Sequence, residues 1–260
     1  MRFKFVLTLR PALHGNVIPI SYQYELSACV NHLLTSDSEA FAAWLGANGL
    51  TPQDNLQRRV YAVSNLYVPR ICVNGDRLQI NVPRVQFWMS FMPTVDTEQY
   101  VRRCFADRQV VLGDRVSRVA FDVTDISVVS SVDYSEVMEY TTMSPIVVVG
   151  MRPNHRLEYL KPDNPVFAQF MYDELVERYE ILHKRPYTGS TDFKMELLAP
   201  PKRKSVSIRR FTPQELSVVG YMMRLRLTMS PELQQLAYET GLGDKTNIGF
   251  GYIELLNKQA

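Results

Sequence analysis

Residues 2–10 read RFKFVLTLR, and this stretch begins the pattern that decides the fold. Apolar side chains occupy every second position and share one face, which predicts a half-buried β-strand. Apolar residues then recur at helical spacing over about 22–34, and Ser21 is a candidate cap for that helix. A strand followed by an amphipathic helix is the opening of a βαββαβ unit.

The rest of the first half continues this order. A shorter helix is predicted at 38–47, and the Asn74-Gly75 pair predicts a tight turn between two strands. The further elements that we predict here are strands at about 59–68, 76–82 and 86–92, a helix at 97–107, and a Val-rich strand region at 109–128 that turns at Gly113-Asp114.

The second half repeats the pattern. Its predicted elements are a strand at 142–149, a helix at 164–183, a hairpin with arms at 193–199 and 205–211 across Pro200-Pro201-Lys202, a long strand at 216–229, a helix that begins at Ser230-Pro231, and a closing strand at 248–255. We therefore predict an α+β protein of two tandem ferredoxin-like (RRM-like) βαββαβ domains, at 1–130 and 131–260.

Several functional classes are disfavoured by composition. The 260 residues carry 29 basic and 27 acidic side chains, a net charge of +2, and only three cysteines and four scattered histidines. This spacing argues against a disulfide framework and against a metal site, so we expect no metal, no cofactor and a reducing cytoplasm. No run reaches the roughly 18 apolar residues of a membrane helix, and residues 1–5 do not resemble a signal peptide.

Positive charge is concentrated between Lys194 and Arg226. Eight basic side chains there face only Glu196 and Glu215, a local excess of six positive charges. Such a segment could track a phosphate backbone, although edge-strand lysines of a solvated hairpin would look the same. The candidate RNA-binding side chains are Lys202, Arg203 and Lys204 at the predicted hairpin tip, Arg209 and Arg210 on one arm, and Arg224 and Arg226 beyond it.

The segment at 241–251, GLGDKTNIGFG, is the most informative one for function. Glycines permit left-handed backbone and close approach, and consecutive amides can form an anion-binding concavity. The spacing fits neither a P-loop nor a dinucleotide fingerprint, and the alternative is a tight helix-to-strand connection. Because four glycines and a lysine exceed what that connection needs, we predict phosphate contact through Gly241, Gly243, Gly249, Gly251 and Lys245.

This glycine-rich segment resembles the C-terminal signature of the RAMP superfamily, and more narrowly of the CRISPR-associated endoribonuclease that cuts repeat RNA. Other stretches are similar to further motifs of that family in the same order: Ile18-Pro19 with Tyr22–Leu26 at the first helix, Tyr61–Leu66 for its FTFS-type strand, Trp88–Phe91 for its WxxSF-type segment, and Met143–Ile146 for its SPI-type segment.

The resemblance implies metal-independent cleavage of CRISPR repeat RNA. A 2′-hydroxyl would attack the scissile phosphate and leave a 2′,3′-cyclic phosphate and a 5′-hydroxyl. The best-known form of the family uses a Tyr, a His and a Lys, but the matching positions here hold Asn31, Gly46 and Arg59. Gly46 cannot carry a proton, and arginine keeps the positive charge without serving as a base at neutral pH.

Two routes to catalysis stay open. His32 lies on the first helix beside Asn31, off its apolar stripe, and has a pKa suited to proton transfer; it could equally be an exposed histidine at a helix end. Alternatively, Arg59 and Lys245 stabilise charge while the RNA is held in line for attack. Tyr24, on the same helix, is a candidate for base stacking or for packing.

Three functions follow in order of preference: an active repeat-RNA endoribonuclease, a repeat-RNA-binding protein without catalysis, and a structural subunit of a CRISPR effector complex. The second is motivated by Asn31 and Gly46. Association with other effector subunits and homodimer formation are both left open by the sequence.

Overall fold

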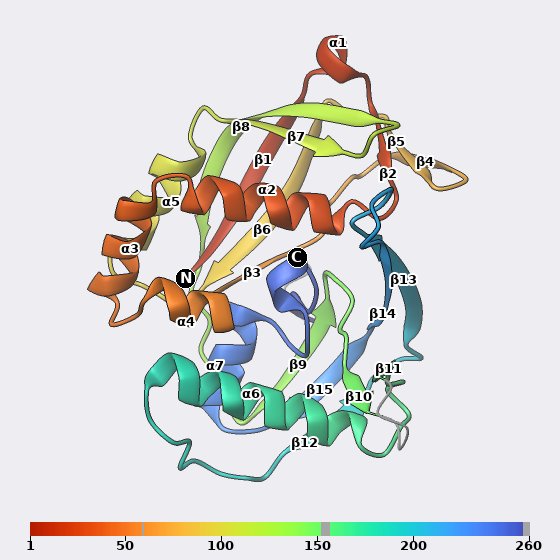
Figure 1. Cartoon of the computed structure of the whole chain (residues 1–260). Coiled ribbons are helices and arrows are strands. Elements are labelled where there is room, and N and C mark those ends of the chain that lie inside the picture. Colours follow the sequence, from red (N-terminus) through yellow and green to blue (C-terminus); the bar gives the residue numbers. More distant parts are fainter. Residues whose placement is uncertain (59, 152–156, 257–260) are drawn as a thin grey trace.

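The protein is described here from a computed structural model covering residues 1–58, 60–151 and 157–256. Two antiparallel sheets, one from each half of the chain, are each accompanied by helices (Figure 1). No helix within these ranges is long and apolar enough to cross a membrane.

The first half is built on a five-stranded antiparallel sheet. In spatial order its strands are β3 (Tyr61–Val63), β6 (Arg84–Phe91), β1 (Arg2–Leu9), β8 (Arg118–Val129) and β7 (Gln109–Gly113). The first four follow the ferredoxin-like order, in which the first and third strands lie at the centre. Helix α2 (Gln23–Thr35) crosses one face of this sheet in Figure 1, and α5 (Thr97–Phe105) is the second helix of the unit.

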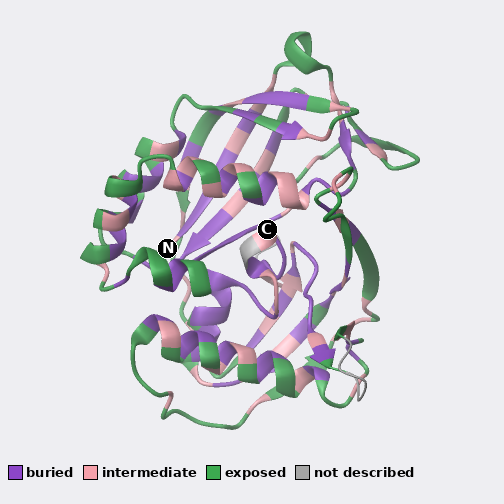
Figure 2. Cartoon of the chain, in the orientation of Figure 1, coloured by how far each residue is buried: buried purple, intermediate pink, exposed green. Residues whose placement is uncertain are grey.

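Strand β1 has the predicted alternation. Phe3, Phe5 and Leu7 are fully buried, and Phe5 stacks on Phe87 of β6 with ring centroids 4.6 Å apart. Figure 2 shows buried positions along the sheet and on the inward faces of the helices. The first half also contains α1 (Pro11–His14), α3 (Ser38–Ala47), α4 (Pro52–Gln57) and a small sheet of β2 (Val17–Pro19), β5 (Arg77–Ile80) and β4 (Ile71–Asn74).

The second half repeats the same strand order. Its sheet consists of β12 (Lys194–Leu197), β15 (Arg224–Thr228), β9 (Val137–Thr142) and β16 (Ile253–Leu255), with α6 (Phe167–His183) and α7 (Pro231–Thr240). Two hairpins are inserted: β10 (Val149–Met151) with β11 (Leu157–Tyr159), and β13 (Lys202–Ile208) with β14 (Leu216–Met222). The predicted α+β class with tandem ferredoxin-like units is confirmed, whereas the division into domains at residue 130 stays a prediction.

The predicted hairpin across Pro200-Pro201-Lys202 is wrong. Strand β12 pairs with β15, whereas β13 pairs with β14, so the two prolines lie where the chain passes from one sheet to another. Residues 202–204 therefore lie at the open end of the β13–β14 hairpin, and residues 209–215 form its tip. The long strand predicted at 216–229 is divided between β14 and β15.

Smaller differences also have physical causes. Ser21 does not cap α2; instead its Oγ accepts a hydrogen bond from the backbone N–H of Ser207, 3.3 Å away on β13. The strand predicted at 142–149 is wrong: β9 ends at Thr142, and residues 143–148 form only isolated bridges, from Ile146 to β14 and from Val147 to the glycine-rich segment. The turn at Asn74-Gly75 is confirmed, between β4 and β5.

The two halves are joined by charged groups that are partly or wholly buried. The Arg2 guanidinium, 4% exposed, donates to the Glu254 carboxylate at 2.6 Å and to the Tyr238 carbonyl at 2.7 Å. It also lies over the Tyr238 ring, 3.4 Å from the centroid. On another side, Lys184 at the end of α6 pairs with Asp54 of α4. The two halves are thus held together by ion pairs at two separate places.

Candidate functional site: the glycine-rich loop on the first helix

The glycine-rich segment connects α7 to β16 and contains the short 3-10 helix η1 (Thr246–Ile248). All four of its glycines have positive φ, from 73° at Gly243 to 90° at Gly249. A β-carbon at Gly243 would also overlap the Val147 carbonyl, so both backbone angle and space require glycine there. The segment is a tightly packed loop rather than an open strand connection.

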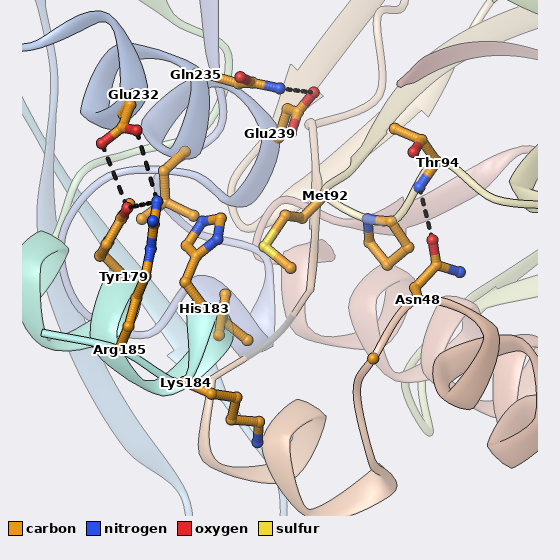
Figure 3. Close-up of a pocket in the computed structure, with 14 residues that line it drawn as sticks. Asn48, Met92, Thr94, Tyr179, His183, Lys184, Arg185, Glu232, Gln235 and Glu239 are labelled. Carbon is orange, nitrogen blue, oxygen red and sulfur yellow. Dashed lines mark hydrogen bonds and ion pairs between the residues drawn. The ribbon is translucent and has the colours of Figure 1, made fainter. Parts of the chain in front are cut away.

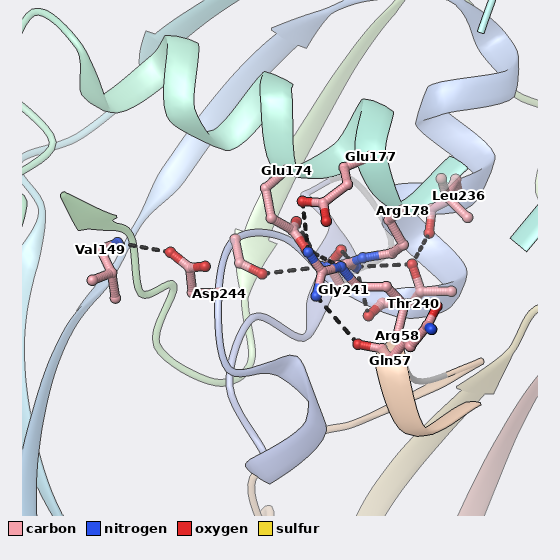
Figure 4. A network of polar contacts seen from close by, with 11 residues as sticks. Gln57, Arg58, Val149, Glu174, Glu177, Arg178, Leu236, Thr240, Gly241 and Asp244 are labelled. Atoms are coloured by element: carbon pink, nitrogen blue, oxygen red, sulfur yellow. Dashed lines mark hydrogen bonds and ion pairs between the residues drawn. The ribbon is translucent and has the colours of Figure 1, made fainter. Parts of the chain in front are cut away.

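The buried Arg178 of α6 donates hydrogen bonds to the backbone carbonyls of this loop (Figure 4). Arg178 of α6 is 1% exposed, and its guanidinium donates to the carbonyls of Thr240, Gly241 and Gly243 at 3.0, 2.6 and 3.0 Å. It also donates to both carboxylate oxygens of Glu174, each at 2.7 Å. Burial raises the pKa of Glu174, and the charge of Arg178 opposes that rise. The loop conformation is therefore fixed by an ion pair in the interior.

The amides of the loop are largely used within the protein. The N–H groups of Gly241 and Gly251 donate to the carbonyls of Ala237 and Pro145, each at 2.9 Å, and that of Gly249 reaches the Thr246 carbonyl at 3.4 Å. Contact between these glycines and phosphate stays a prediction. The positive charge of the loop is Lys245, which is half-buried and has φ 62° at the start of η1.

The loop packs onto the first half of the chain. Helix η1 lies against α2 and β3, and a β-carbon at Gly249 would come within 2.9 Å of the Gln23 carbonyl on the first turn of α2. Figure 1 shows this C-terminal segment between α2 and β9. The lysine-bearing loop and the helix that carries His32 thus meet, although nothing in the sequence pattern required this contact.

The predicted catalytic positions lie in different surroundings. His32 is exposed in the last turn of α2, whereas the Asn31 side-chain oxygen accepts a hydrogen bond from the Tyr61 hydroxyl at 3.1 Å. Gly46 is exposed on α3, with no atom within 4 Å of a β-carbon placed there. Arg59 lies outside the described residues. The sequence pattern does not indicate the contact of Tyr61 on β3 with Asn31, because the two residues are 30 positions apart.

The basic residues fall into two groups. Arg210 pairs with Asp76 at 2.7 Å, and Arg226 pairs with Glu139 at 2.7 Å and with Glu196 at 3.0 Å. The local charge excess is therefore partly neutralised by Asp76 and Glu139, which lie outside the segment. The second group is exposed and forms no ion pair within the described part of the chain. It consists of Lys202, Arg203, Lys204, Arg209 and Arg224.

Tyr24 sits beside a small apolar cluster. Its ring is half-buried and packs against a group that includes Val206, Val218 and Phe250. It also lines a cleft under the tip of the β13–β14 hairpin. Tyr24 thus packs against the apolar cluster on one side and can contact a ligand in the cleft on the other.

A separate cleft of about 530 Å³ lies at the junction of the two halves (Figure 3). His183 lines it and packs on Tyr179, with ring centroids 4.3 Å apart. Burial and the nearby Arg185 charge lower the pKa of His183, so its imidazole is neutral at neutral pH. Tyr179 and His183 are four residues apart on α6, a spacing that places them on one helix face and could have pointed to this pair.

No group of three or more His, Cys, Asp or Glu side chains that could hold a metal ion occurs within residues 1–58, 60–151 and 157–256. The expectations of no metal and no cofactor stay predictions. The chemistry available to the described residues is proton transfer by an exposed histidine and charge stabilisation by lysine and arginine.

Comparison with known proteins identifies relatives of the chain. Residues 130–255 match the family described as CRISPR associated protein Cas6, C-terminal. A CRISPR-associated endoribonuclease-like protein Cas6 of Pyrococcus furiosus is 29% identical over 154 residues, a match that covers 56% of this chain and 58% of the relative. The chain thus matches less than two thirds of that relative's length.

Solved structures share the fold over nearly the whole chain. A Cas6-related protein from Pyrococcus furiosus has a TM-score of 0.80 at 22% identity and covers 100% of this chain and 99% of its own. A RAMP protein described as binding different RNA substrates has a TM-score of 0.77 at 21% identity and covers 98% of this chain and 99% of its own. The predicted resemblance is confirmed as a likeness: the chain shares the fold of solved Cas6-related and RAMP proteins, and its residues 130–255 match the Cas6 C-terminal family.

Proposed function

We propose that the protein is an endoribonuclease that binds CRISPR repeat RNA and cuts it without a metal ion. The observation that carries the proposal is the packing of the lysine-bearing glycine loop onto α2, the helix on which His32 is exposed. The Cas6 C-terminal domain supports the substrate class. The proton carrier and the positive charge then belong to two segments in contact, with the loop at the first turn of α2 and His32 in its last turn.

The proposed reaction is an internal transfer at phosphorus. The 2′-hydroxyl gives up its proton and its oxygen bonds to the adjacent phosphorus, while the bond to the 5′-oxygen breaks and that oxygen takes a proton. The products are a 2′,3′-cyclic phosphate and a 5′-hydroxyl. His32 serves in one proton transfer, and Lys245 and Arg59 stabilise the negative charge that develops on the phosphoryl oxygens.

A second candidate is a repeat-RNA-binding protein without catalysis. It is favoured by Gly46, which offers no side chain for proton transfer, and by Asn31, whose side-chain oxygen is engaged by Tyr61. RNA would then bind along the exposed basic residues of β13 and the loop. In both cases, homodimer formation and association with other CRISPR effector subunits stay predictions.

Cleavage of labelled repeat RNA in the presence of EDTA tests the proposal. The repeat is taken from the array nearest the gene, and we expect one cut that yields a cyclic phosphate end. His32→Ala should slow this cut by about a hundredfold or more, as loss of a general acid or base does. The matched control is His14→Ala, which removes another exposed histidine at a helix end.

The alternatives predict different results. An unchanged rate in His32→Ala together with a slow His183→Ala variant would move the chemistry to the cleft of Figure 3. Absence of any cut, combined with tight binding that weakens steeply with salt, would select the non-catalytic function.

A further inference from the structure

A cleft of about 480 Å³ lies under the tip of the β13–β14 hairpin, and we call it the hairpin-tip cleft. Three segments line it: the first turn of α2, the turn between β7 and β8, and the tip itself. The cleft is thus formed by both halves of the chain. The lining side chains used below are Tyr24, Glu25, Asp114, Arg115, Arg118 and Arg209.

The walls of the hairpin-tip cleft are fixed by hydrogen bonds and ion pairs. Arg210 at the tip pairs with Asp76, and Asp114 accepts from Arg77 at 2.7 Å. Asp114 also accepts from the amides of Val116 and Ser117 at 2.9 and 3.0 Å, which closes the β7–β8 turn. The cleft is therefore formed before any ligand arrives.

The hairpin tip contains strained backbone. Arg209 and Phe211 have φ of 52° and 61°, a region that side-chain-bearing residues seldom occupy. The Thr212 hydroxyl donates to the Arg209 carbonyl at 2.7 Å, and the Phe211 amide donates to the Glu215 carboxylate at 2.9 Å. Such strain persists only where surrounding contacts impose it and is concentrated at functional sites.

Three arginines of the cleft are available to a ligand. Arg115, Arg118 and Arg209 are exposed, and within the described ranges none of them forms an ion pair with a carboxylate. Arg118 donates from Nε to the Asp114 carbonyl at 3.2 Å, which leaves its terminal nitrogens free for other acceptors. Three guanidinium groups around one opening suit a phosphodiester chain.

Glu25 is the unexpected member of this basic cleft. Its Oε2 is buried, and no hydrogen-bond donor contacts it among the described residues. Burial raises the pKa of Glu25 to about 7 and the Asp114 charge adds to the rise, whereas a hydrogen bond from the residue's own backbone N–H and the charge of Arg210 oppose it. A buried acceptor without a partner is costly, so a ligand that brings N–H donors to this oxygen would remove that cost.

We propose that the hairpin-tip cleft binds an unpaired guanosine nucleotide through the Glu25 carboxylate. The two carboxylate oxygens accept hydrogen bonds from N1–H and from the N2 amino group of the base. Tyr24, one residue away on α2, provides an aromatic surface for stacking. Arg115, Arg118 and Arg209 contact the flanking phosphates.

Guanine is selected by its pattern of donors. Its Watson–Crick edge carries two adjacent N–H donors, which match two carboxylate oxygens, whereas adenine and cytosine each present one amino group beside an acceptor. The acceptor of those bases would face the carboxylate and repel it. Uracil presents a single N–H donor between two carbonyl acceptors, so a carboxylate at this position distinguishes guanine from the other three bases.

This inference deepens the proposed function and rests on it, because the guanosine is taken to be part of an RNA strand. Free guanosine monophosphate has the same chemistry, so the experiment includes both. The RNA probes are fluorescent heptanucleotides of adenosine with a central guanosine, inosine or adenosine. Inosine lacks the N2 amino group and removes one of the two hydrogen bonds.

We expect the native protein to bind the guanosine probe about tenfold more tightly than the all-adenosine probe, with inosine between them. Glu25→Gln should abolish this preference, and affinity for the all-adenosine probe should rise as the repulsion by the carboxylate is removed. Glu39→Gln, at an exposed glutamate of α3 outside the cleft, should behave as the native protein does. The preference should also weaken from pH 8 to pH 6, because protonation removes one acceptor from Glu25.

The possible outcomes separate the two proposals. RNA binding without guanosine preference, or a preference that survives Glu25→Gln, overturns the guanosine site and leaves the proposed function intact. Binding of guanosine monophosphate that depends on Glu25, with no binding of any RNA, supports the site and contradicts the proposed function. Failure of both ligands to bind overturns both. The inosine comparison uses unaltered protein and does not depend on the folding of a variant.

Discussion

At the scale of single residues, the buried carboxylate of Glu25 should make stability depend on pH. Its pKa of about 7 in the folded protein exceeds the value of about 4.3 in unfolded chains. The folded state therefore binds the proton more tightly. The stabilisation is present below the unfolded pKa and is lost as pH rises from about 4.3 to 7.

Glu25→Gln keeps the neutral form at every pH. At pH 8 we expect its free energy of unfolding to exceed that of the native protein by roughly 1 kcal/mol, after allowance for partial exposure, so that it unfolds at a higher urea concentration. At pH 5 the difference should be smaller. Urea midpoints at the two pH values measure this, with Glu39→Gln as the reference variant. Parallel pH curves for native protein and Glu25→Gln would contradict it.

Individual residues also show what a sequence cannot reveal. The exposed position of His32 follows from its place off the apolar stripe of α2, and it was predictable. The pairing of Arg210 with Asp76 and of Arg226 with Glu139 was not, because these partners are 134 and 87 positions away. A charge count along a segment treats every arginine as unpaired, whereas the fold determines which arginines form ion pairs with carboxylates.

At the scale of elements, the contact between η1 and α2 depends on one glycine. Gly249→Ala would place a β-carbon 2.9 Å from the Gln23 carbonyl at a φ of 90°. Gly49→Ala is the matched control, because Gly49 has a φ of 72° and no atom within 4 Å of a new β-carbon. Gly49→Ala introduces only the backbone strain of a positive φ, about 1 kcal/mol, whereas Gly249→Ala adds the displacement of the loop.

We expect Gly249→Ala to lower the free energy of unfolding by more than Gly49→Ala does, and to reduce RNA cleavage or binding as η1 moves away from α2. Urea unfolding and the RNA assays measure the two effects. Equal losses in the two variants would mean that the loop does not need its close approach to α2.

The hairpins show why elements are easier to predict than their pairing. Strand β1 and helix α3 were predicted from the local sequence alone. The Pro200-Pro201 pair correctly marks an interruption, but turn chemistry does not say which strand comes next in the sheet. Pairing of β12 with β15 needs residues about thirty positions away.

At the scale of the whole molecule, Arg2 couples the two halves. Its guanidinium is buried among Glu254, Tyr238 and Tyr252 of the second half, although it belongs to β1 of the first. Arg2→Met should lower the free energy of unfolding by about 3 kcal/mol, since it leaves the Glu254 carboxylate without its cationic partner. Arg10→Met, which removes an exposed ion pair with Asp122, should cost less than about 1 kcal/mol.

The same coupling predicts one cooperative transition for the native protein. Both tryptophans, Trp44 and Trp88, lie in the first half, so their fluorescence follows that half alone. Far-UV circular dichroism follows the helices of both halves. The two urea curves should coincide in the native protein. A gap between them would show that the halves unfold independently.

The repetition of one strand order in both halves was predictable, because the hydrophobic spacings typical of strands and helices follow one another in the same order in each half. The way in which the halves meet was not. The glycine loop is recognisable as a sequence motif. Its packing against α2 depends on the close contact of Gly249 with the Gln23 carbonyl, and its carbonyls are bound by Arg178 of α6, a helix without a recognised motif.

The guanidinium of Arg178 has a thermodynamic consequence for ligand binding. It holds three backbone carbonyls of the glycine loop together with Glu174 inside the protein. The conformational entropy of this loop is thus lost when the chain folds, so the RNA that we propose to bind there would meet a loop that is already ordered. No ordering of this backbone would then reduce the affinity of that proposed contact.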